Sequence, residues 1–225
     1  MRSWSWIVLL IASSAFGEAQ VIGFNRAPMG GMPAGWSAYM THSGGAPRWL
    51  VIKDPATHGN PKVLAQLSDD ATRSRFPLAI DREVSFQDGT ISVSFRTVSG
   101  KIDQGAGLVW RFIDADNYYV ARANALEDNV VLYKVEKGIR TPLSAKGTPP
   151  GTYGVNHKVA PLLWHRLSVS FHDGDFSVSL NDEKLFEVED GTFSGEGKTG
   201  LWTKADSVIY FRDFRIKNDS ALPRH

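Results

Sequence analysis

One stretch near the middle of the chain gathers most of the side chains that could recognise a ligand. Residues 116–124 and 131–135 combine tyrosines, an arginine, two asparagines and a lysine with small and apolar residues. Aromatic rings stack on sugar faces, and guanidinium and amide groups donate hydrogen bonds to hydroxyl groups. The pattern favours a saccharide-binding surface. The alternative is a β-sandwich strand whose polar residues face only water.

Two arginines interrupt strands that are otherwise apolar. In residues 107–113 the alternation predicts Leu108, Trp110 and Phe112 on one face and Val109, Arg111 and Ile113 on the other. A charge among apolar neighbours must be paired or line a groove, because an unpaired buried charge is costly. If residues 114–116 close a hairpin, Arg111 and Arg122 share a surface.

This argument selects five candidate ligand-binding residues: Arg111, Tyr119, Arg122, Asn124 and Lys134. Tyr119 has the opposite parity to Arg122 on a regular strand. It therefore joins the surface only through a bulge or at the rim. The other interpretation of the arginines is structural, as ion-paired or snorkelling residues.

No catalytic residue is assigned, although three side chains could supply an acid or a base: Glu127, His165 and Asp206. Glycoside hydrolysis needs paired carboxylates, and the adjacent Glu127 and Asp128 would point to opposite faces of a strand. The sequence contains no Gly-x-Ser-x-Gly nucleophile motif. Lys204 and Asp206 are expected to pair across a tight turn.

The run Asp114-x-Asp116-Asn117 resembles the start of a calcium-binding loop. An EF-hand loop starting at Asp114 needs glycine at its sixth position and glutamate at its twelfth, where Tyr119 and Ala125 stand. A turn capped by Asp and Asn side chains fits better. We expect no cofactor; a single divalent metal bridging sandwich loops is the alternative left open.

The N-terminal residues and the composition indicate the cellular compartment of the protein. Residues 1–19 have one arginine, an apolar run and then small residues, which is the pattern of a signal peptide. The chain has no cysteine and a formal net charge of +1, so neither disulfides nor a basic nucleic-acid footprint is expected. We expect a secreted or periplasmic bacterial protein with no membrane anchor after cleavage and no nucleic-acid partner.

Alternation with a period of two dominates the rest of the sequence. It is clearest in residues 91–96, 166–172 and 176–181, and Asp173-Gly174 separates the last two as a hairpin turn would. The expected fold is all-β, an antiparallel two-sheet β-sandwich of the jelly-roll type with a turn or two of helix. The expected organisation is a signal peptide (1–19), an extended lead-in (20–47), the sandwich (48–217) and a tail (218–225).

Several segments together resemble the concanavalin A-like lectin/glucanase superfamily, in its laminin-G-like branch and the family named 3-keto-disaccharide hydrolase. The resemblance spans about residues 48–217 and is carried by residues 107–111, 116–119, Arg122-x-Asn124, 132–134, Trp164-His165-x-Leu167, Asp190-x-Thr192-Phe193 and 200–202. It implies a two-sheet sandwich with a concave face that binds or processes saccharides outside the cytoplasm. It assigns no catalytic residue, because no defined catalytic motif matches.

Three functions therefore stand as hypotheses. The leading one is a secreted protein that binds or processes a saccharide or glycan. The second is an enzyme that cleaves 3-keto-glycosides, and the third is a structural or adhesive module of the cell envelope. A pocket with converging carboxylates or histidines would favour the enzyme, and a groove with an exposed ring would favour binding.

Overall fold

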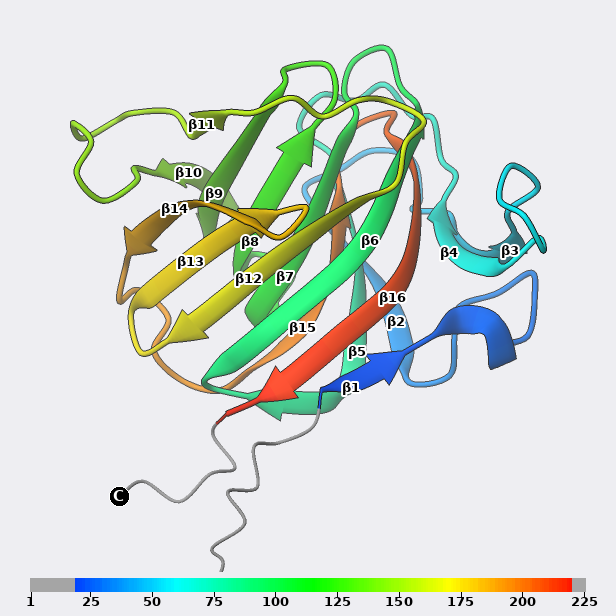
Figure 1. Ribbon diagram of the computed structural model, residues 1–225, viewed down its shortest axis with the longest axis horizontal. Helices are drawn as coiled ribbons and strands as arrows, with labels where there is room; N and C mark the ends of the chain where they lie inside the picture. Colours follow the sequence, from blue (N-terminus) through cyan, green and yellow to red (C-terminus); the bar gives the residue numbers. More distant parts are fainter. Residues whose placement is uncertain (1–18, 220–225) are drawn as a thin grey trace, which may run out of the picture.

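The computed structural model describes residues 19–219, which form two antiparallel β-sheets packed face to face (Figure 1). Residues 1–18, which hold almost all of the predicted signal peptide, lie outside the described residues. Within residues 19–219 no helix is long and apolar enough to cross a membrane. The only helix in this range is the 3-10 turn η1 (Phe24–Arg26). The predicted jelly-roll sandwich with minimal helix is confirmed.

We call the sheet nearer the viewer in Figure 1 the front sheet and the other the rear sheet. Across the front sheet the order is β14 (Glu183–Glu189), β13 (Asp175–Leu180), β12 (His165–His172), β6 (Gly89–Ser99), β16 (Val208–Asn218), β4 (Lys62–Gln66) and β3 (Trp49–Lys53), with β1 (Gln20–Ile22) paired to β16. Across the rear sheet it is β10 (Ile139–Leu143), β9 (Asn129–Glu136), β8 (Asn117–Asn124), β7 (Gly105–Asp114), β15 (Gly197–Thr203), β5 (Phe76–Phe86) and β2 (Trp36–Thr41), with β11 (Val155–Asn156) paired to β9.

The alternating sequence pattern translates directly into strand faces. In β12 and β13 the apolar residues are buried between the sheets and the intervening polar residues are exposed or partly exposed. His172 pairs with Asp175, so Asp173 and Gly174 form the two-residue turn that the sequence predicts. Asp173 has a φ of 48°, a left-handed conformation suited to such a tight turn.

The expected boundary at residue 48 is wrong. β1 and β2 both lie within residues 20–47, and each pairs with a strand of a different sheet. Trp36 on β2 is buried and its ring packs edge-on against Phe214 of β16. The segment therefore belongs to the sandwich, and its Gly- and Pro-rich composition masked the short strands.

A bulge in β7 changes the predicted faces of that strand. Its pairing with β8 shifts between Trp110 and Asp114, and Arg111 has a φ of 47°. Before the bulge, Trp110 faces the core between the sheets; after it, Phe112 joins the opposite face with Val109. The extra residue thus reverses the parity of everything beyond it.

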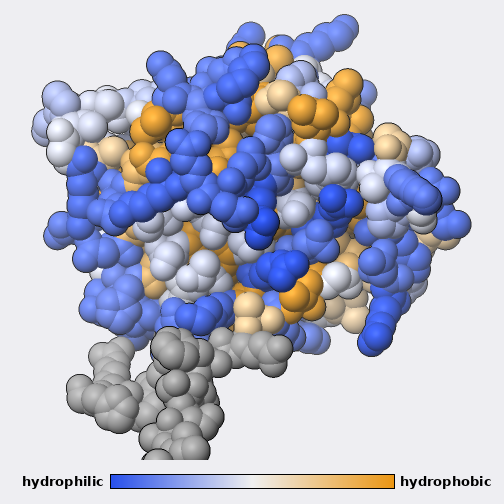
Figure 2. Space-filling view, in the orientation of Figure 1, coloured by the Kyte–Doolittle hydropathy of each residue, from blue (hydrophilic) through white to orange (hydrophobic). Residues whose placement is uncertain are grey.

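The outer face of the front sheet is mostly polar. Figure 2 shows hydrophilic residues over most of this side, with smaller hydrophobic areas between them. Serines alternate with core residues along β6, β12 and β13. The outer face of the rear sheet differs, because its centre is buried and largely apolar.

Candidate functional site

The rear sheet is curled so strongly that its two edges touch. The two ring nitrogens of His42, just after edge strand β2, lie 2.8 Å from the carbonyl oxygens of Ser74 and of Gly138, and a neutral imidazole donates to one of them at a time. Gly138 belongs to the β9–β10 turn at the other edge. The hydroxyl groups of Thr41 on β2 and Tyr118 on β8 are 2.8 Å apart. The outer face of this sheet is therefore concave.

Buried apolar and aromatic side chains fill the middle of this concave face. They are Phe76, Leu78, Ile80, Val109, Phe112, Tyr118, Val120, Val131, Tyr133, Val135 and Trp202. Polar side chains gather beyond them, around the loop that joins β8 to β9. We call Asp103, Arg122, Asn124, Glu127, Asn129 and Tyr153 the Arg122 cluster.

Arg122 is the centre of this cluster and has no exposed surface. Its Nη2 donates to Glu127 (3.1 Å), to the Asn129 side-chain oxygen (2.7 Å) and, at 3.5 Å, to the Tyr153 hydroxyl. Its Nε and Nη1 are buried and have no hydrogen-bond partner among the described residues. Buried guanidinium nitrogens are normally hydrogen-bonded, so Arg122 holds two donors that an external acceptor could satisfy once the side chains covering them move.

Backbone features make the space for Arg122. Gly105 lies beside it on β7, where an added Cβ would approach the Arg122 Cδ to 3.2 Å and the Asp103 Oδ1 to 2.8 Å. Gly154 has a φ of 58°, and a Cβ there would meet the Val130 carbonyl oxygen at 2.5 Å. Glycine at this second position lets the loop carrying Tyr153 lie close against β9.

Two carboxylates flank Arg122. The Asn124 side-chain amide donates to Asp103 Oδ1 (3.0 Å) and to Glu127 Oε1 (3.2 Å), so these carboxylates are near neighbours. Burial alone would raise the pKa of Glu127, but the hydrogen bond and positive charge of Arg122 outweigh it and hold that pKa below its usual value. Both carboxylates have cationic partners, since Asp103 accepts from Lys204 at 2.7 Å.

Two tyrosines lie beside Arg122: Tyr153 of the cluster and Tyr133 of the buried centre of the face. The Arg122 Cζ lies 5.7 Å from the centroid of the Tyr133 ring, and the Tyr133 and Tyr153 hydroxyls are 2.5 Å apart. Tyr153 is 47% exposed, whereas Tyr133 is buried. Tyr153 therefore forms the outer wall above Arg122, on the loop between β10 and β11.

The five predicted ligand-binding residues do not share one surface. Arg122 and Asn124 lie in the Arg122 cluster, as their common parity predicts. Arg111 lies elsewhere: it donates to the carbonyl oxygens of Phe193 (2.6 Å) and Asp173, and its Cζ lies 5.6 Å from the Phe176 ring in the core. The expectation that Arg111 and Arg122 share a surface is wrong because of the β7 bulge.

Tyr119 and Lys134 also face away from the cluster. The Tyr119 hydroxyl donates to Asp190 Oδ1 (2.6 Å), and the Lys134 Nζ donates to Asp190 Oδ2 (3.2 Å) and Thr192 Oγ1 (2.7 Å). With Arg111, these residues anchor the loop that follows β14. Their polar groups have partners within the protein, which suits the structural alternative.

The three candidate acid–base residues separate as well. Glu127 belongs to the Arg122 cluster. His165 lies in the front sheet, between the Ala160 carbonyl oxygen (2.9 Å) and the Asn181 amide (3.1 Å). Asp206 accepts from the backbone N–H groups of residues 101–103 at 2.7 to 3.0 Å, so it caps the loop that carries Asp103. It does not pair with Lys204.

Four residues of this face were not predicted from the sequence: Asp103, Asn129, Arg140 and Tyr153. Arg140 could have been found, because the Lys137-Gly138 turn places it in register with Val135 and so on the concave face. Tyr153 and Asp103 lie in irregular loops, where no periodicity reports which way a side chain points.

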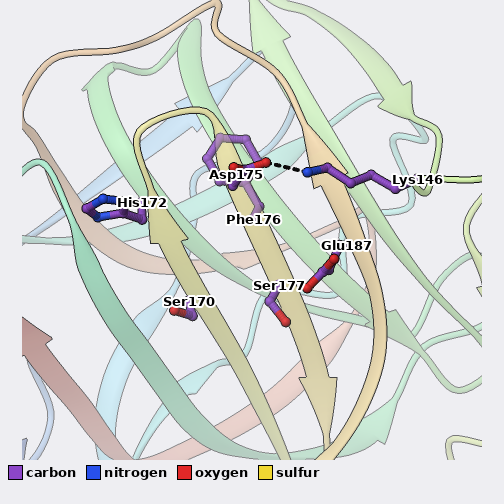
Figure 3. Close-up of a pocket in the computed structure, with 7 residues that line it drawn as sticks. All are labelled: Lys146, Ser170, His172, Asp175, Phe176, Ser177 and Glu187. Carbon is purple, nitrogen blue, oxygen red and sulfur yellow. Dashed lines mark hydrogen bonds and ion pairs between the residues drawn. The ribbon is translucent and has the colours of Figure 1, made fainter.

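A second hollow lies over the outer face of β12 to β14 (Figure 3). Its volume is about 250 Å³ and its lining residues are Lys146, Ser170, His172, Asp175, Phe176, Ser177 and Glu187. Figure 3 shows Lys146 reaching Asp175, at 2.5 Å. Since its only lysine already has a carboxylate partner, this hollow is the weaker candidate. No group of three or more potential metal ligands occurs in residues 19–219.

Comparison with known proteins gives likenesses of structure. No protein-family model and no curated protein sequence matches the chain. Among solved structures, the carbohydrate-binding module CBM66 from Bacillus subtilis superposes with a TM-score of 0.58 at 21% identity, covering 80% of this chain and 93% of the module. A Bacteroides ovatus mixed-linkage glucan GH16 protein, solved with a G4G4G3G product, gives 0.53 at 11%, covering 80% and 94%.

The fold is that of the concanavalin A-like sandwiches. At these identities the comparison shows the fold and assigns no residue a role. Which ligand the concave face of the rear sheet takes must be argued from its side chains.

Proposed function

We propose that this protein binds a saccharide at the Arg122 cluster, on the concave face of the rear sheet. The observation that carries the proposal is Arg122 itself, fully buried, with two unpartnered guanidinium nitrogens beside the Tyr133 ring. A sugar hydroxyl is an acceptor that such nitrogens can use, and the half-exposed Tyr153 ring gives a sugar face something to stack on. The likeness to a carbohydrate-binding module and a glucan-active protein supports the same class of ligand.

Access to Arg122 runs past Tyr153 and Glu127. Tyr153 is 47% exposed and the Glu127 side chain is 37% exposed, while Arg122 lies beneath both. The Tyr153 hydroxyl is only 3.5 Å from the Arg122 Nη2, so a sugar that moves it aside reaches the guanidinium. Asn124 and Asn129, already oriented by Glu127, add donors and acceptors at the same place.

The test is a panel of neutral and acidic oligosaccharides titrated calorimetrically into the protein. Tyr153→Ala should weaken binding by about tenfold, roughly 1.4 kcal/mol, and leave the melting temperature nearly unchanged because the ring is half exposed. Leu163→Ala is the control, since it removes a similarly exposed apolar side chain (59%) outside the cluster. Equal affinities for wild type and Tyr153→Ala would show that the Arg122 cluster is not the binding site. Absence of binding across the panel would contradict the proposed saccharide binding.

Cleavage of 3-keto-glycosides is the second candidate, favoured by the Asp103–Asn124–Glu127 arrangement. The Asn124 amide nitrogen contacts one oxygen of each carboxylate, at 3.0 and 3.2 Å, and this bridging is compatible with the spacing of about 5 Å found in retaining glycosidases. The lowered pKa of Glu127 suits a base or nucleophile rather than an acid. Turnover of a 3-keto-glycoside by wild type and its loss in Glu127→Gln, measured with and without a divalent metal, would support it.

Location outside the cytoplasm is part of this proposal. It rests on the charged, apolar and small-residue pattern of residues 1–19. N-terminal sequencing of the protein recovered from the periplasm or medium of the expressing cell tests it. A mature form starting near Gln20 is the expected result, and recovery of an unprocessed cytoplasmic chain would contradict it.

A further inference from the structure

A cavity of about 490 Å³ opens beside the Arg122 cluster, where the two edges of the rear sheet meet. It lies between the segment before β5, the β9–β10 turn and the end of β15. Its lining residues are His42, Arg73, Ser74, Phe76, Gly138, Ile139, Arg140 and Lys204. We call this space the Arg140 cavity.

The formally charged residues that line the Arg140 cavity are all cationic. Three cationic side chains line it, from Arg73, Arg140 and Lys204, and no aspartate or glutamate does. Lys204 has a partner, Asp103, at 2.7 Å. Within residues 19–219 neither Arg73 nor Arg140 has a carboxylate at ion-pair distance. The lining therefore carries two arginines that are not ion-paired within the described residues, and the carboxylate beside it, on the exposed Asp116, adjoins Gly138 at the cavity edge.

Arg140 is held in place by rings. Its Cζ lies 4.5 Å from the Tyr133 ring centroid, 4.7 Å from Phe76 and 5.7 Å from Trp202. Its Nη1 is buried and has no hydrogen-bond partner in the described part of the chain. Cation–π contacts orient a guanidinium through its flat face and use none of its N–H groups. Because Nη1 of Arg140 is buried, a ligand in the cavity would meet the guanidinium at Nε and Nη2.

We infer that the Arg140 cavity receives the anionic group of an acidic saccharide, a carboxylate or a sulfate. A planar guanidinium with free N–H groups matches the paired oxygens of either anion. The inference rests on the proposed saccharide binding and names its ligand class. Tyr133 connects the two regions, because its ring contacts both Arg122 and Arg140, so one oligosaccharide can span them.

The test compares three tetrasaccharides by calorimetry: a galacturonate oligomer carrying carboxylates, a sulfated galactan oligomer, and neutral galactotetraose. At low salt we expect at least one acidic ligand to bind about tenfold or more tightly than the neutral one, and raising NaCl to roughly 0.5 M to remove most of that difference. Comparison of the two acidic ligands identifies which anion the cavity prefers.

Two variants and a control assign the effect to the cavity. Arg140→Met keeps an apolar stem over the rings and should lower affinity for the acidic ligand by about tenfold, and Arg73→Gln by about threefold, as expected for partly screened charges. Arg73 is exposed, so its replacement does not threaten folding. Arg166→Gln, an exposed arginine on the front sheet, should change nothing.

The outcomes separate this inference from the proposed function. Equal affinity for acidic and neutral tetrasaccharides, unchanged in Arg140→Met and Arg73→Gln, would overturn the inference while leaving saccharide binding in place. Loss of preference for the acidic ligand in both variants, with neutral binding retained, would support it. Absence of binding to any of the three tetrasaccharides would overturn both.

Discussion

His42 and Gly138 come from opposite edges of one β-sheet and are joined by a hydrogen bond of 2.8 Å. In strand order, β2 and β10 are the two ends of the rear sheet, so this contact is possible only because the sheet curls back on itself. The Thr41–Tyr118 contact lies beside it. Together these contacts close one side of the concave face, and His42 and Gly138 also line the Arg140 cavity.

Removing the imidazole should loosen this closure. His42→Phe preserves the ring contact with Phe76 (centroids 5.3 Å apart) but removes the N–H that donates to the Ser74 or Gly138 carbonyl oxygen. We expect a loss of about 1–2 kcal/mol in the free energy of unfolding by urea denaturation. His172→Phe, at a side chain that is 76% exposed, is the control. Equal stability of the two variants would mean that the edges are held by other contacts.

Arg111 should be a stability residue. It is buried and tethers the carbonyl oxygens of Phe193 and Asp173, with Asp88 at 3.5 Å. Arg111→Met leaves these buried acceptors unpaired, so we expect a loss of about 2–4 kcal/mol with saccharide affinity unchanged. The measurements are urea unfolding and calorimetric titration. If Arg111→Met keeps wild-type stability but loses affinity for the saccharide, Arg111 is a ligand-binding residue after all.

Glu127 should make stability depend on pH in the acid range. Its pKa is depressed in the folded protein, so the ionised form favours folding above the unfolded pKa of about 4.3. This contribution is lost as pH falls through the folded pKa. At pH 7 Glu127→Gln should cost about 1 kcal/mol, a modest value because the carboxylate is one-third exposed and screened.

The check on Glu127 is urea unfolding of wild type and Glu127→Gln at neutral and acid pH. Their difference in unfolding free energy should shrink as the pH drops below about 4. Glu136→Gln, an exposed glutamate at the end of β9, serves as the control. A difference that stays constant across this range would show that the carboxylate does not act through its charge.

Gly105 should tolerate no side chain, because a Cβ there would press on both Asp103 and Arg122. Gly105→Ala should therefore displace the guanidinium, lower stability by about 1–3 kcal/mol and weaken saccharide binding. Gly191→Ala is matched to it, since no atom lies within 4 Å of an added Cβ at that position. Stability is measured by differential scanning calorimetry and affinity by ligand titration, on both variants. If Gly105→Ala changes neither, the residues around Gly105 can move to accommodate a side chain.

The fold class and several strand pairings could be predicted from the sequence. Alternation along residues 166–172 and 176–181, with Asp173-Gly174 between them, specifies two antiparallel strands because a two-residue turn and a period of two leave one consistent register. The same logic correctly placed Arg122 and Asn124 on one face of β8. These are local properties, and the residues that determine them are close together in the chain.

The site was decided by tertiary structure. A single bulged residue at Arg111 reversed the parity of β7, and neither composition nor spacing marks it. The curl of the rear sheet brought Arg140 over Phe76 and Trp202, from three separate strands, and put Lys204 beside Asp103, which lies 101 residues earlier. Strand periodicity determines which way a side chain points. Which distant strand it then meets depends on how the whole sheet bends to bury its apolar surface.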